Sequence, residues 1–177
     1  DVNVTAVSSP YEYAGFYDGE VYHGDCFSYE VIQPTKYTRA LPDYLEESNM
    51  CVRIREEMLV KTVTTHGDVT ILDFGQNFAG HVVCTQTIPK GVTMTLEFGE
   101  ILQKGNFYHD NYRTAESKFT YISDGKSREI RPRFTFFGFR YAKVEGLEVV
   151  DPADFTAVVL SSDLRPTLRC ETSHQKL

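Results

Sequence analysis

The sequence predicts an all-β fold: an antiparallel β-sandwich with an irregular N-terminal extension. Three observations support this prediction. Several segments alternate apolar and polar residues with a period of two, turn-forming residues recur about every ten positions, and no long segment repeats at the helical period of about 3.6 residues. The 11 Tyr and 12 Phe favour pleated, half-buried surfaces. Short strands at this spacing are typical of two packed antiparallel sheets or of a barrel.

The extension covers residues 1–48, which contain several turn pairs but no self-contained apolar core. Short extended pieces are expected at 20–22 and 28–32, and a single helical turn at 41–47, with a proline near its start. We interpret residues 1–48 as the tail of a preceding β-domain plus a linker. This extension either pairs onto the edge of the sandwich or stays separate.

The sandwich itself is expected over residues 49–165, followed by a connector at 166–177. The expected strands are 52–54, 58–63, 69–74 closed by Gly75, 80–88, 92–98, 117–122, 130–136, 139–144 and 155–160. The clearest of them is 92–98, where Val92, Met94, Leu96 and Phe98 share one face and Thr93, Thr95 and Glu97 share the other. This alternation predicts a strand with one buried face.

Charge and composition exclude several kinds of partner. The formal net charge of -7 makes a nucleic acid an unfavourable partner, because an acidic chain repels phosphate backbones. No apolar run approaches the roughly 20 residues that a membrane-spanning helix needs. The five histidines are scattered without the spacing of a metal site, and no phosphate-binding glycine loop or nucleophile elbow is present.

The four cysteines are Cys26, Cys51, Cys84 and Cys170. Their spacings match neither a zinc site nor a redox pair. Each is flanked by strand-like sequence, where a free cysteine usually behaves as a small buried apolar residue. We therefore expect them to be reduced and structural, although their even number leaves a disulfide open.

The first candidate site is the segment from Asp73 to Gly80, which follows an expected strand and also contains Gly75, Gln76 and Asn77. In one interpretation, it is a loop whose side-chain amides bind sugar hydroxyls. In the other, it is a tight connection between strands, in which Gln76 and Asn77 cap backbone groups. The structural interpretation is favoured.

The second candidate site is the polar, aromatic-rich segment 108–113. Asp110 and Asn111 carry the oxygen ligands that calcium prefers, and the same oxygens could bind sugar hydroxyls. Arg113 could donate to two acceptors, and Tyr108 and Tyr112 could stack on a sugar ring. The alternative is a solvated loop in which Arg113 pairs with an acidic residue of the same domain.

A third segment, 131–141, alternates arginines with aromatic residues. This pattern can mimic a nucleic-acid surface, but the acidic net charge argues against that reading. We expect a packing role instead, with Arg140 in an ion pair. The aromatic side chains expected in the core are Phe134, Phe136, Phe139 and Tyr141.

Several sequence blocks together resemble bacterial α-L-rhamnosidases, over the segment that lies just before their catalytic domain. The blocks, in order, are Tyr17–Tyr22, Leu72–Gly80, Thr95–Leu102 followed by Gly105, Asn111–Ala115 and Thr120-Tyr121, then Arg131–Tyr141, and Ser162-Asp163 with Cys170–Ser173. Their order and spacing agree over roughly residues 15–177. The motif residues with a structural role by this resemblance are Asp73, Gly75, Gln76, Asn77, Gly80, Arg133, Gly138, Arg140 and Tyr141. Residues 23–25 and Phe137 depart from the family pattern, which weakens any transfer of polar contacts there.

The resemblance implies a concanavalin-like, jelly-roll type of sandwich that acts as a non-catalytic accessory domain. Such enzymes remove terminal α-L-rhamnose by means of acidic residues in an (α/α)6 barrel. None of the barrel's motifs is present here, so no catalytic residue is assigned. The implied partners are the catalytic and N-terminal domains of the same parent chain. The alternative function is a module that binds rhamnose-containing glycans, with no cofactor other than the calcium considered at Asp110 and Asn111.

Overall fold

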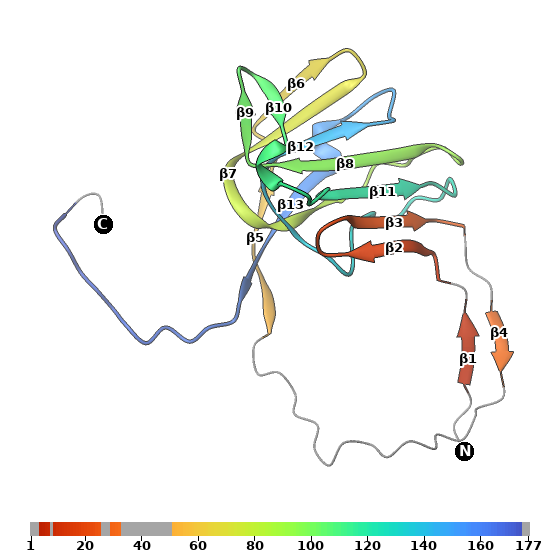
Figure 1. The fold of residues 1–177 in the computed structure, drawn as a ribbon, viewed down its shortest axis with the longest axis horizontal. Coiled ribbons are helices and arrows are strands. Elements are labelled where there is room, and N and C mark those ends of the chain that lie inside the picture. The colour runs from red at the N-terminus through yellow and green to blue at the C-terminus, as the bar shows by residue number, and fades with distance from the viewer. Residues whose placement is uncertain (1–3, 8, 26–28, 33–50, 175–177) are drawn as a thin grey trace.

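Nearly all regular structure in this chain is β-strand, as the computed structural model shows for residues 4–7, 9–25, 29–32 and 51–174 (Figure 1). The all-β prediction is confirmed, and the only helices among these residues are the 3-10 turns η1 (Asp110–Tyr112) and η2 (Pro152–Asp154). The main sheet contains β2 (Tyr11–Gly15), β3 (Gly19–His23), β5 (Val52–Leu59), β6 (Thr62–His66), β7 (Val69–Cys84), β8 (Thr93–Gly99), β11 (Lys118–Ile122), β12 (Phe137–Glu145) and β13 (Phe155–Ser162).

The main sheet is one continuous, curled sheet. Its strand order is β2-β3-β11-β8-β12-β7-β13-β5, and β6 pairs with β7. The sheet curls around a shared core, which is the arrangement of a β-sandwich (Figure 1). One described pair departs from the antiparallel prediction, because β3 and β11 run parallel. A parallel neighbour requires a long connection, and here 94 residues separate the end of β3 at His23 from the start of β11 at Lys118.

Two smaller sheets accompany it. Strand β1 (Val4–Val7) pairs with β4 (Tyr29–Ile32), and these two strands lie apart from the curled sheet (Figure 1). Strand β9 (Ile101–Gln103) pairs with β10 (Asn106–Tyr108). The helical turn expected at 41–47 lies outside the described residues. No helix in the described ranges is both long enough and apolar enough to cross a bilayer.

The alternating segment 92–98 forms a half-buried strand, as predicted. It corresponds to β8, where Met94, Leu96 and Phe98 are fully buried. Thr93 on the opposite face is exposed, and β11 and β12 flank the strand on its two edges. The period-two pattern is accurate here because one face of the strand packs on the core while the other faces solvent.

Strand β7 corrects the prediction that a strand ends at Gly75. It runs for 16 residues, Val69–Cys84, and pairs with β6, β12 and β13. Between its two halves the register with β12 shifts, so that Tyr141 faces Asp73 but Phe139 faces Phe78. The extra residues of β7 form a bulge, and Gly75 supplies the φ of +82° that this bulge requires.

The core is rich in phenylalanine, and Phe139 lies at its centre. Its ring centroid is 4.6 Å from that of Phe78, 4.8 Å from that of Phe98 and 5.8 Å from that of Phe74. Phe98 also stacks on Phe137 with a centroid distance of 4.1 Å. Aromatic pairs at such distances add stability beyond their buried area.

The prediction that Phe134 and Phe136 belong to this core is wrong. Their side chains are 62% and 45% exposed, whereas Phe139 and Tyr141 are buried as expected. Residues 131–136 form no strand, and Ile130 makes only an isolated bridge to Cys84. Alternation therefore does not fix a buried face in this segment, because the chain crosses the end of the sheet instead of pairing within it.

The cysteines agree with prediction only in part. Cys51, Cys84 and Cys170 are free thiols, but Cys84 alone of these three is buried. Burial raises the pKa of the Cys84 thiol to about 12, which keeps it protonated and unreactive at neutral pH. Cys51 and Cys170 are exposed because they lie outside the strands that cover the core. Cys26 lies outside the described residues.

The hairpin β2–β3 joins the main sheet through β11, so residues 11–23 of the predicted extension lie within the sandwich sheet. Glu20 on β3 is 1% exposed. Its carboxylate accepts hydrogen bonds from the backbone amides of Arg133 (3.0 Å to each oxygen) and Phe134. This contact fixes the 131–136 crossing to the hairpin. The domain boundaries after residues 48 and 165 stay predictions.

Candidate functional site

The β7 bulge is held by an ion pair between Asp73 and Arg140. Arg140 Nε lies 2.8 Å from Asp73 Oδ1, and Nη2 lies 2.9 Å from Oδ2, so the guanidinium binds both carboxylate oxygens. Asp73 Oδ1 also accepts the Gly75 backbone N–H at 2.6 Å, which closes the turn within the bulge. The predicted ion pair of Arg140 is confirmed, and its role is to hold the bulge of β7 against β12.

This pairing lowers the pKa of Asp73. The hydrogen bonds from Arg140 are the main cause, and the Gly75 amide and the charges of Arg140 and Lys61 add to them against the opposing effect of burial. The Arg140 guanidinium also lies over the Tyr141 ring, with Cζ 5.0 Å from the centroid. Arg140 is therefore engaged at one edge of its guanidinium by Asp73 and at one face by the Tyr141 ring.

Glu100 connects the two candidate segments to each other. Its Oε1 accepts a hydrogen bond from Asn77 Nδ2 at 3.0 Å, and its Oε2 accepts one from Asn111 Nδ2 at 2.9 Å. Asn77 therefore binds a side chain and not the backbone group that the structural interpretation assigned to it. Both amides are engaged with protein, which leaves them less available to sugar hydroxyls.

Tyr112 fixes the same segment to β12. Its hydroxyl donates a hydrogen bond to the Gly138 carbonyl oxygen. Burial, together with the charge of Glu100, raises the pKa of Tyr112 above its usual value. A phenol whose hydroxyl is bound to the backbone in this way positions the loop. We refer to Asp73, Asn77, Glu100, Asn111, Tyr112 and Arg140 as the motif cluster.

The remaining residues of the loop 108–113 are arranged differently. Asp110 begins η1 and is exposed, and Tyr108 at the end of β10 is half-buried. Arg113 has a φ of +61° and an exposed side chain, and no carboxylate pairs with it in the described ranges. The expected internal partner of Arg113 is thus not found. Binding of sugar or calcium by this loop stays a prediction, and no group of three or more metal-ligating side chains occurs within the described residues.

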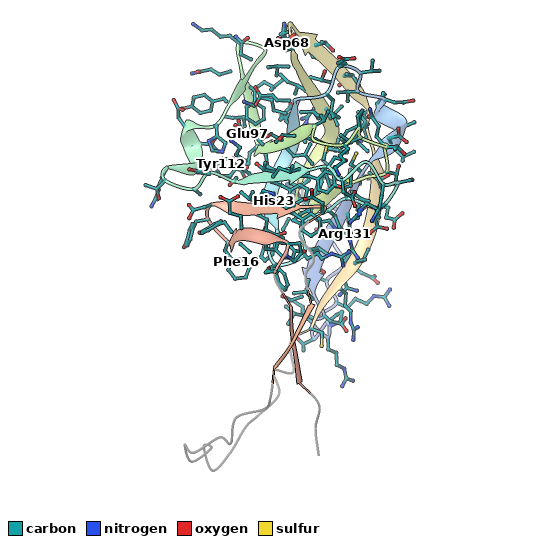
Figure 2. All side chains as sticks on the ribbon, turned by 90° about the vertical axis from the view of Figure 1, so that its right-hand side faces the viewer. Phe16, His23, Asp68, Glu97, Tyr112 and Arg131 are labelled. Atoms are coloured by element: carbon teal, nitrogen blue, oxygen red, sulfur yellow. The ribbon has the colours of Figure 1, made fainter. Side chains whose placement is uncertain are left out.

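Three further predicted motif residues are not part of the hydrogen-bonded motif cluster. Gly80 permits β13 to approach β7, because a Cβ at this position would lie 2.0 Å from the Val158 carbonyl oxygen. Arg133 contributes its backbone amide to Glu20 on the other side of the molecule. Gln76 is exposed in the bulge. Figure 2 shows this separation: Tyr112 of the motif cluster and Arg131 of the 131–136 crossing lie on opposite sides of the sandwich.

Sequence reasoning missed Glu100 as a member of the cluster. Glu100 follows the alternating strand directly after Gly99 and lies within a recognised block, which is the signal that was available. Its two asparagine partners are 23 and 11 residues away, so their meeting depends on the fold. The side chains of the motif cluster bind one another and the backbone of β12.

The substitution Asp73→Asn is expected to destabilise the chain by about 1–2 kcal/mol at pH 7, because hydrogen bonds to a charged group are worth about 1.5–3 kcal/mol and this pair is partly exposed. The carboxyl pKa is lowered on folding, so its contribution is fully present above the unfolded pKa of about 3.9 and is lost as the pH falls through the folded pKa. The difference in unfolding free energy between wild type and variant should therefore be constant from pH 5 to 7 and shrink below pH 4.

Urea denaturation at a series of pH values measures this difference. Asp68→Asn is the control, because it removes one exposed carboxylate without touching the bulge. A difference that grows as the pH falls would contradict the role assigned to the ion pair.

Comparison with known proteins gives a consistent result. Residues 63–161 match the family model described as the bacterial alpha-L-rhamnosidase concanavalin-like domain. The chain is similar to an alpha-L-rhamnosidase of Alteromonas sp. (strain LOR), with 43% identity over 83 residues that cover 46% of this chain and 9% of the relative. It is also similar to an alpha-L-rhamnosidase of Formosa agariphila, with 33% identity over 122 residues that cover 66% of this chain and 13% of the relative.

A solved structure agrees with these sequence relatives. The Streptomyces avermitilis alpha-L-rhamnosidase, solved in complex with L-rhamnose, superposes with a TM-score of 0.77 and 28% identity, covering 88% of this chain and 17% of that one. This chain thus spans about a tenth of the length of the curated relatives it matches. The matched residues include β7, β8, β11, β12 and most of β13, and they contain all six residues of the motif cluster. The chain belongs to the family of concanavalin-like domains of bacterial alpha-L-rhamnosidases.

Proposed function

We propose that this chain is the non-catalytic accessory β-sandwich of an α-L-rhamnosidase, and that it packs against and supports the catalytic domain of the same polypeptide. The observation that carries this proposal is the state of the motif cluster. Its acidic and amide side chains are bound to other groups of the domain: Asp73 to Arg140, and Glu100 to Asn77 and Asn111. These bonds hold β7 to β12 and to the loop 108–113. No two carboxylates of the motif cluster are left free to act together on a substrate.

The electrostatics of the carboxyl groups support the same proposal. Glycoside hydrolysis needs two carboxyl groups about 5–9.5 Å apart, one of them a general acid with a raised pKa. The shifts seen at Asp73 and Asp124 go the other way. For Asp124, burial acts upward, but the Lys126 amide and the charges of Arg128 and Lys126 outweigh it and lower the pKa. Both groups are thus held ionised, which suits ion pairs and not proton donation.

An exposed apolar face supports the packing role. Val52 and Ile54 on the edge strand β5 are 59% and 58% exposed, although both are large hydrophobic residues. Val52 lines a groove of about 150 Å³ together with Phe136 and Leu160. A sheet edge of this kind is normally covered in the assembled protein. In relatives about ten times longer than the match, another domain of the same chain is the natural cover.

Hydrolysis of an aryl α-L-rhamnoside tests the proposal. Residues 1–177 at high concentration should release no more aryl alcohol than a buffer blank, while the Streptomyces avermitilis enzyme serves as the positive control. Two results together would contradict the accessory role. Release of aryl alcohol would increase with the concentration of the chain, and it would disappear in the double variant Asp73→Asn with Glu100→Gln.

A further inference from the structure

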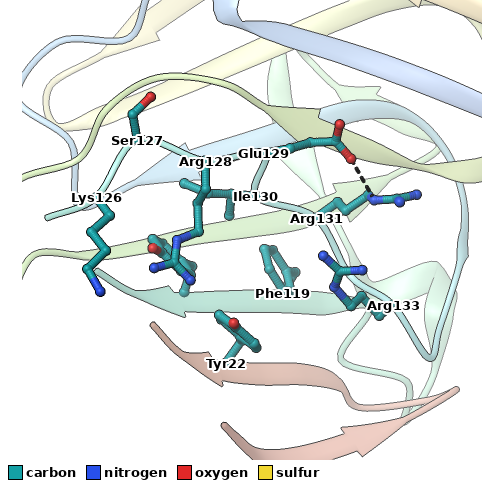
Figure 3. Close-up of a pocket in the computed structure, with 10 residues that line it drawn as sticks. Tyr22, Phe119, Lys126, Ser127, Arg128, Glu129, Ile130, Arg131 and Arg133 are labelled. Atoms are coloured by element: carbon teal, nitrogen blue, oxygen red, sulfur yellow. Dashed lines mark ion pairs between the residues drawn. The ribbon is translucent and has the colours of Figure 1, made fainter. Parts of the chain in front are cut away.

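A pocket on the side of the sandwich away from the motif cluster carries a second set of features. It has a volume of about 400 Å³, within the range of small-molecule sites. It lies between β3, β11 and the segment 126–133, which runs over these two strands in Figure 3. The side chains that line it are aromatic on the floor and cationic on the rim. Nothing in the accessory role uses this combination.

The floor of the pocket is a stacked tyrosine pair. Tyr22 of β3 and Tyr121 of β11 are nearly parallel, with an interplanar angle of 14° and centroids 5.8 Å apart. Tyr22 is half-buried and held from its other side by Tyr11, whose ring meets it edge-on at 5.0 Å. Phe119 and Ile130 complete the apolar floor. Tyr121, Phe119 and Ile130 are at most 3% exposed and support the floor from beneath, so the partly exposed ring of Tyr22 is the surface available to the apolar face of a sugar ring.

The rim carries four cationic side chains within eight residues: Lys126, Arg128, Arg131 and Arg133. Their acidic neighbours are Asp124, which pairs with Arg128 and lies 3.7 Å from Lys126, and Glu129, which lies 2.8 Å from Arg131. With the buried Glu20 beneath the crossing, four cations face three carboxylates. This local excess is notable in a chain whose net charge is -7.

Arg133 is the cation left for a ligand. Its guanidinium has no carboxylate partner among the described residues, and its side chain is exposed. Its backbone is nonetheless fixed, because the Arg133 amide donates to both oxygens of the buried Glu20. In Figure 3 the Arg133 side chain points over the floor beside Phe119, whereas Arg131 extends away toward Glu129. An arginine whose backbone is anchored and whose guanidinium is unpaired can bind a carboxylate with two parallel hydrogen bonds.

We infer that this pocket binds a carboxylate-bearing sugar, a uronic acid, with its ring against Tyr22 and its carboxylate on Arg133. The choice of a sugar ring rests on the proposed function, since the domain belongs to enzymes that act on glycosides. The requirement for a negative charge comes from the pocket alone. A neutral deoxy sugar such as rhamnose offers nothing to the free guanidinium and should bind here poorly.

Calorimetric titration of residues 1–177 at constant ionic strength tests this inference. The ligands are D-glucuronate and D-galacturonate, with D-glucose and D-galactose as rings without the charge, and acetate as the charge without a ring. At least one uronate should bind about tenfold or more tightly than its neutral counterpart and than acetate, because a hydrogen-bonded charged group contributes that much. Equal binding of a uronate and its neutral sugar, equal binding of acetate, or no binding of either uronate would overturn the inference.

Variants locate the site. Arg133→Gln should weaken uronate binding about tenfold and leave the weak binding of the neutral sugar unchanged, and Arg133→Lys should recover part of the loss. Arg165→Gln is the matched control, because it removes an exposed arginine outside the pocket. Arg133→Gln and Arg133→Lys both keep the backbone bond to Glu20, and melting temperatures equal to that of the wild type confirm that they are folded. Unchanged affinity in Arg133→Gln would refute the site. None of these outcomes bears on aryl rhamnoside hydrolysis, which tests the accessory role separately.

Discussion

The substitution Glu20→Ala is expected to cost about 3 kcal/mol of unfolding free energy. Glu20 is buried and accepts the backbone amides of Arg133 and Phe134. Alanine leaves these two amides without an acceptor, and an unsatisfied buried donor costs about 1–3 kcal/mol. The loss also frees the hairpin β2–β3 from the 131–136 crossing, so the effect reaches two distant segments. Urea denaturation followed by far-ultraviolet circular dichroism measures it.

Glu20→Gln is the informative companion to this variant. Glutamine retains one acceptor oxygen but places an amide donor against an N–H group, so it should fall between wild type and alanine. Glu12→Ala on the same hairpin is the control, because Glu12 is exposed and its partner is the side chain of His23. If Glu20→Ala loses less than about 0.5 kcal/mol, the range of ordinary surface substitutions, then the buried carboxylate does not fix the crossing.

The substitution Phe139→Ala should be the more damaging of the two, with a loss of about 3–5 kcal/mol. Phe139 is fully buried and its ring contacts Phe74, Phe78 and Phe98. Removing the ring leaves a cavity. The surrounding backbone cannot collapse to fill it, because β12 is paired on both edges, with β7 and with β8. Since small domains have a total stability of about 5–15 kcal/mol, the variant should unfold at a much lower urea concentration.

Phe136→Ala provides the matched control for this loss. It removes the same side chain three residues away, but the Phe136 ring is 45% exposed, so the expected loss is below about 1 kcal/mol. Comparable losses in the two variants would show that the core does not centre on β12. The pair also tests the reading of 131–136 as a crossing, because a core strand there would make both positions equally sensitive.

The strands with one buried face could be predicted from the sequence because their side chains face two different environments. In β8, Met94 and Leu96 face the core while Thr93 faces solvent, so period two is visible in the letters alone. The same holds for Phe119 and Tyr121 in β11. Such a local pattern needs no knowledge of the partner strand, and it is sufficient for the all-β class.

The features that could not be predicted depend on contacts that are distant in sequence. Gly75 is a good end for a strand when read locally, but β6, β12 and β13 together hold β7 extended on both sides of its bulge. Alternation around Phe134 resembles that of a core strand, yet no neighbouring strand pairs with 131–136. The presence of a partner strand decides which side of such a segment is buried, and the local sequence does not indicate whether a partner strand is present.

In the candidate site, too, some features follow from the local sequence and others depend on contacts that are distant in sequence. That Arg140 forms an ion pair could be expected from an arginine among aromatic residues, but its partner Asp73 is 67 residues away. The polar character of the loop 108–113 is visible in the sequence, whereas the bonds of Asn111 to Glu100 and of Tyr112 to Gly138 depend on the folded sheet. The sequence thus indicates which side chains are polar and grouped, and the fold decides which of them remain available to a ligand.

The parallel pairing of β3 with β11 has a consequence for synthesis on the ribosome. β3 finds its neighbour only after Ile122 has been translated, and Glu20 meets its amides 113 and 114 residues later in the chain. Until then the hairpin emerges with an unpaired edge, and contacts of such long sequence separation form slowly. A nascent chain of this domain therefore depends on protection of its first hairpin, and slowing translation before Ile122 should prolong the period in which it can aggregate.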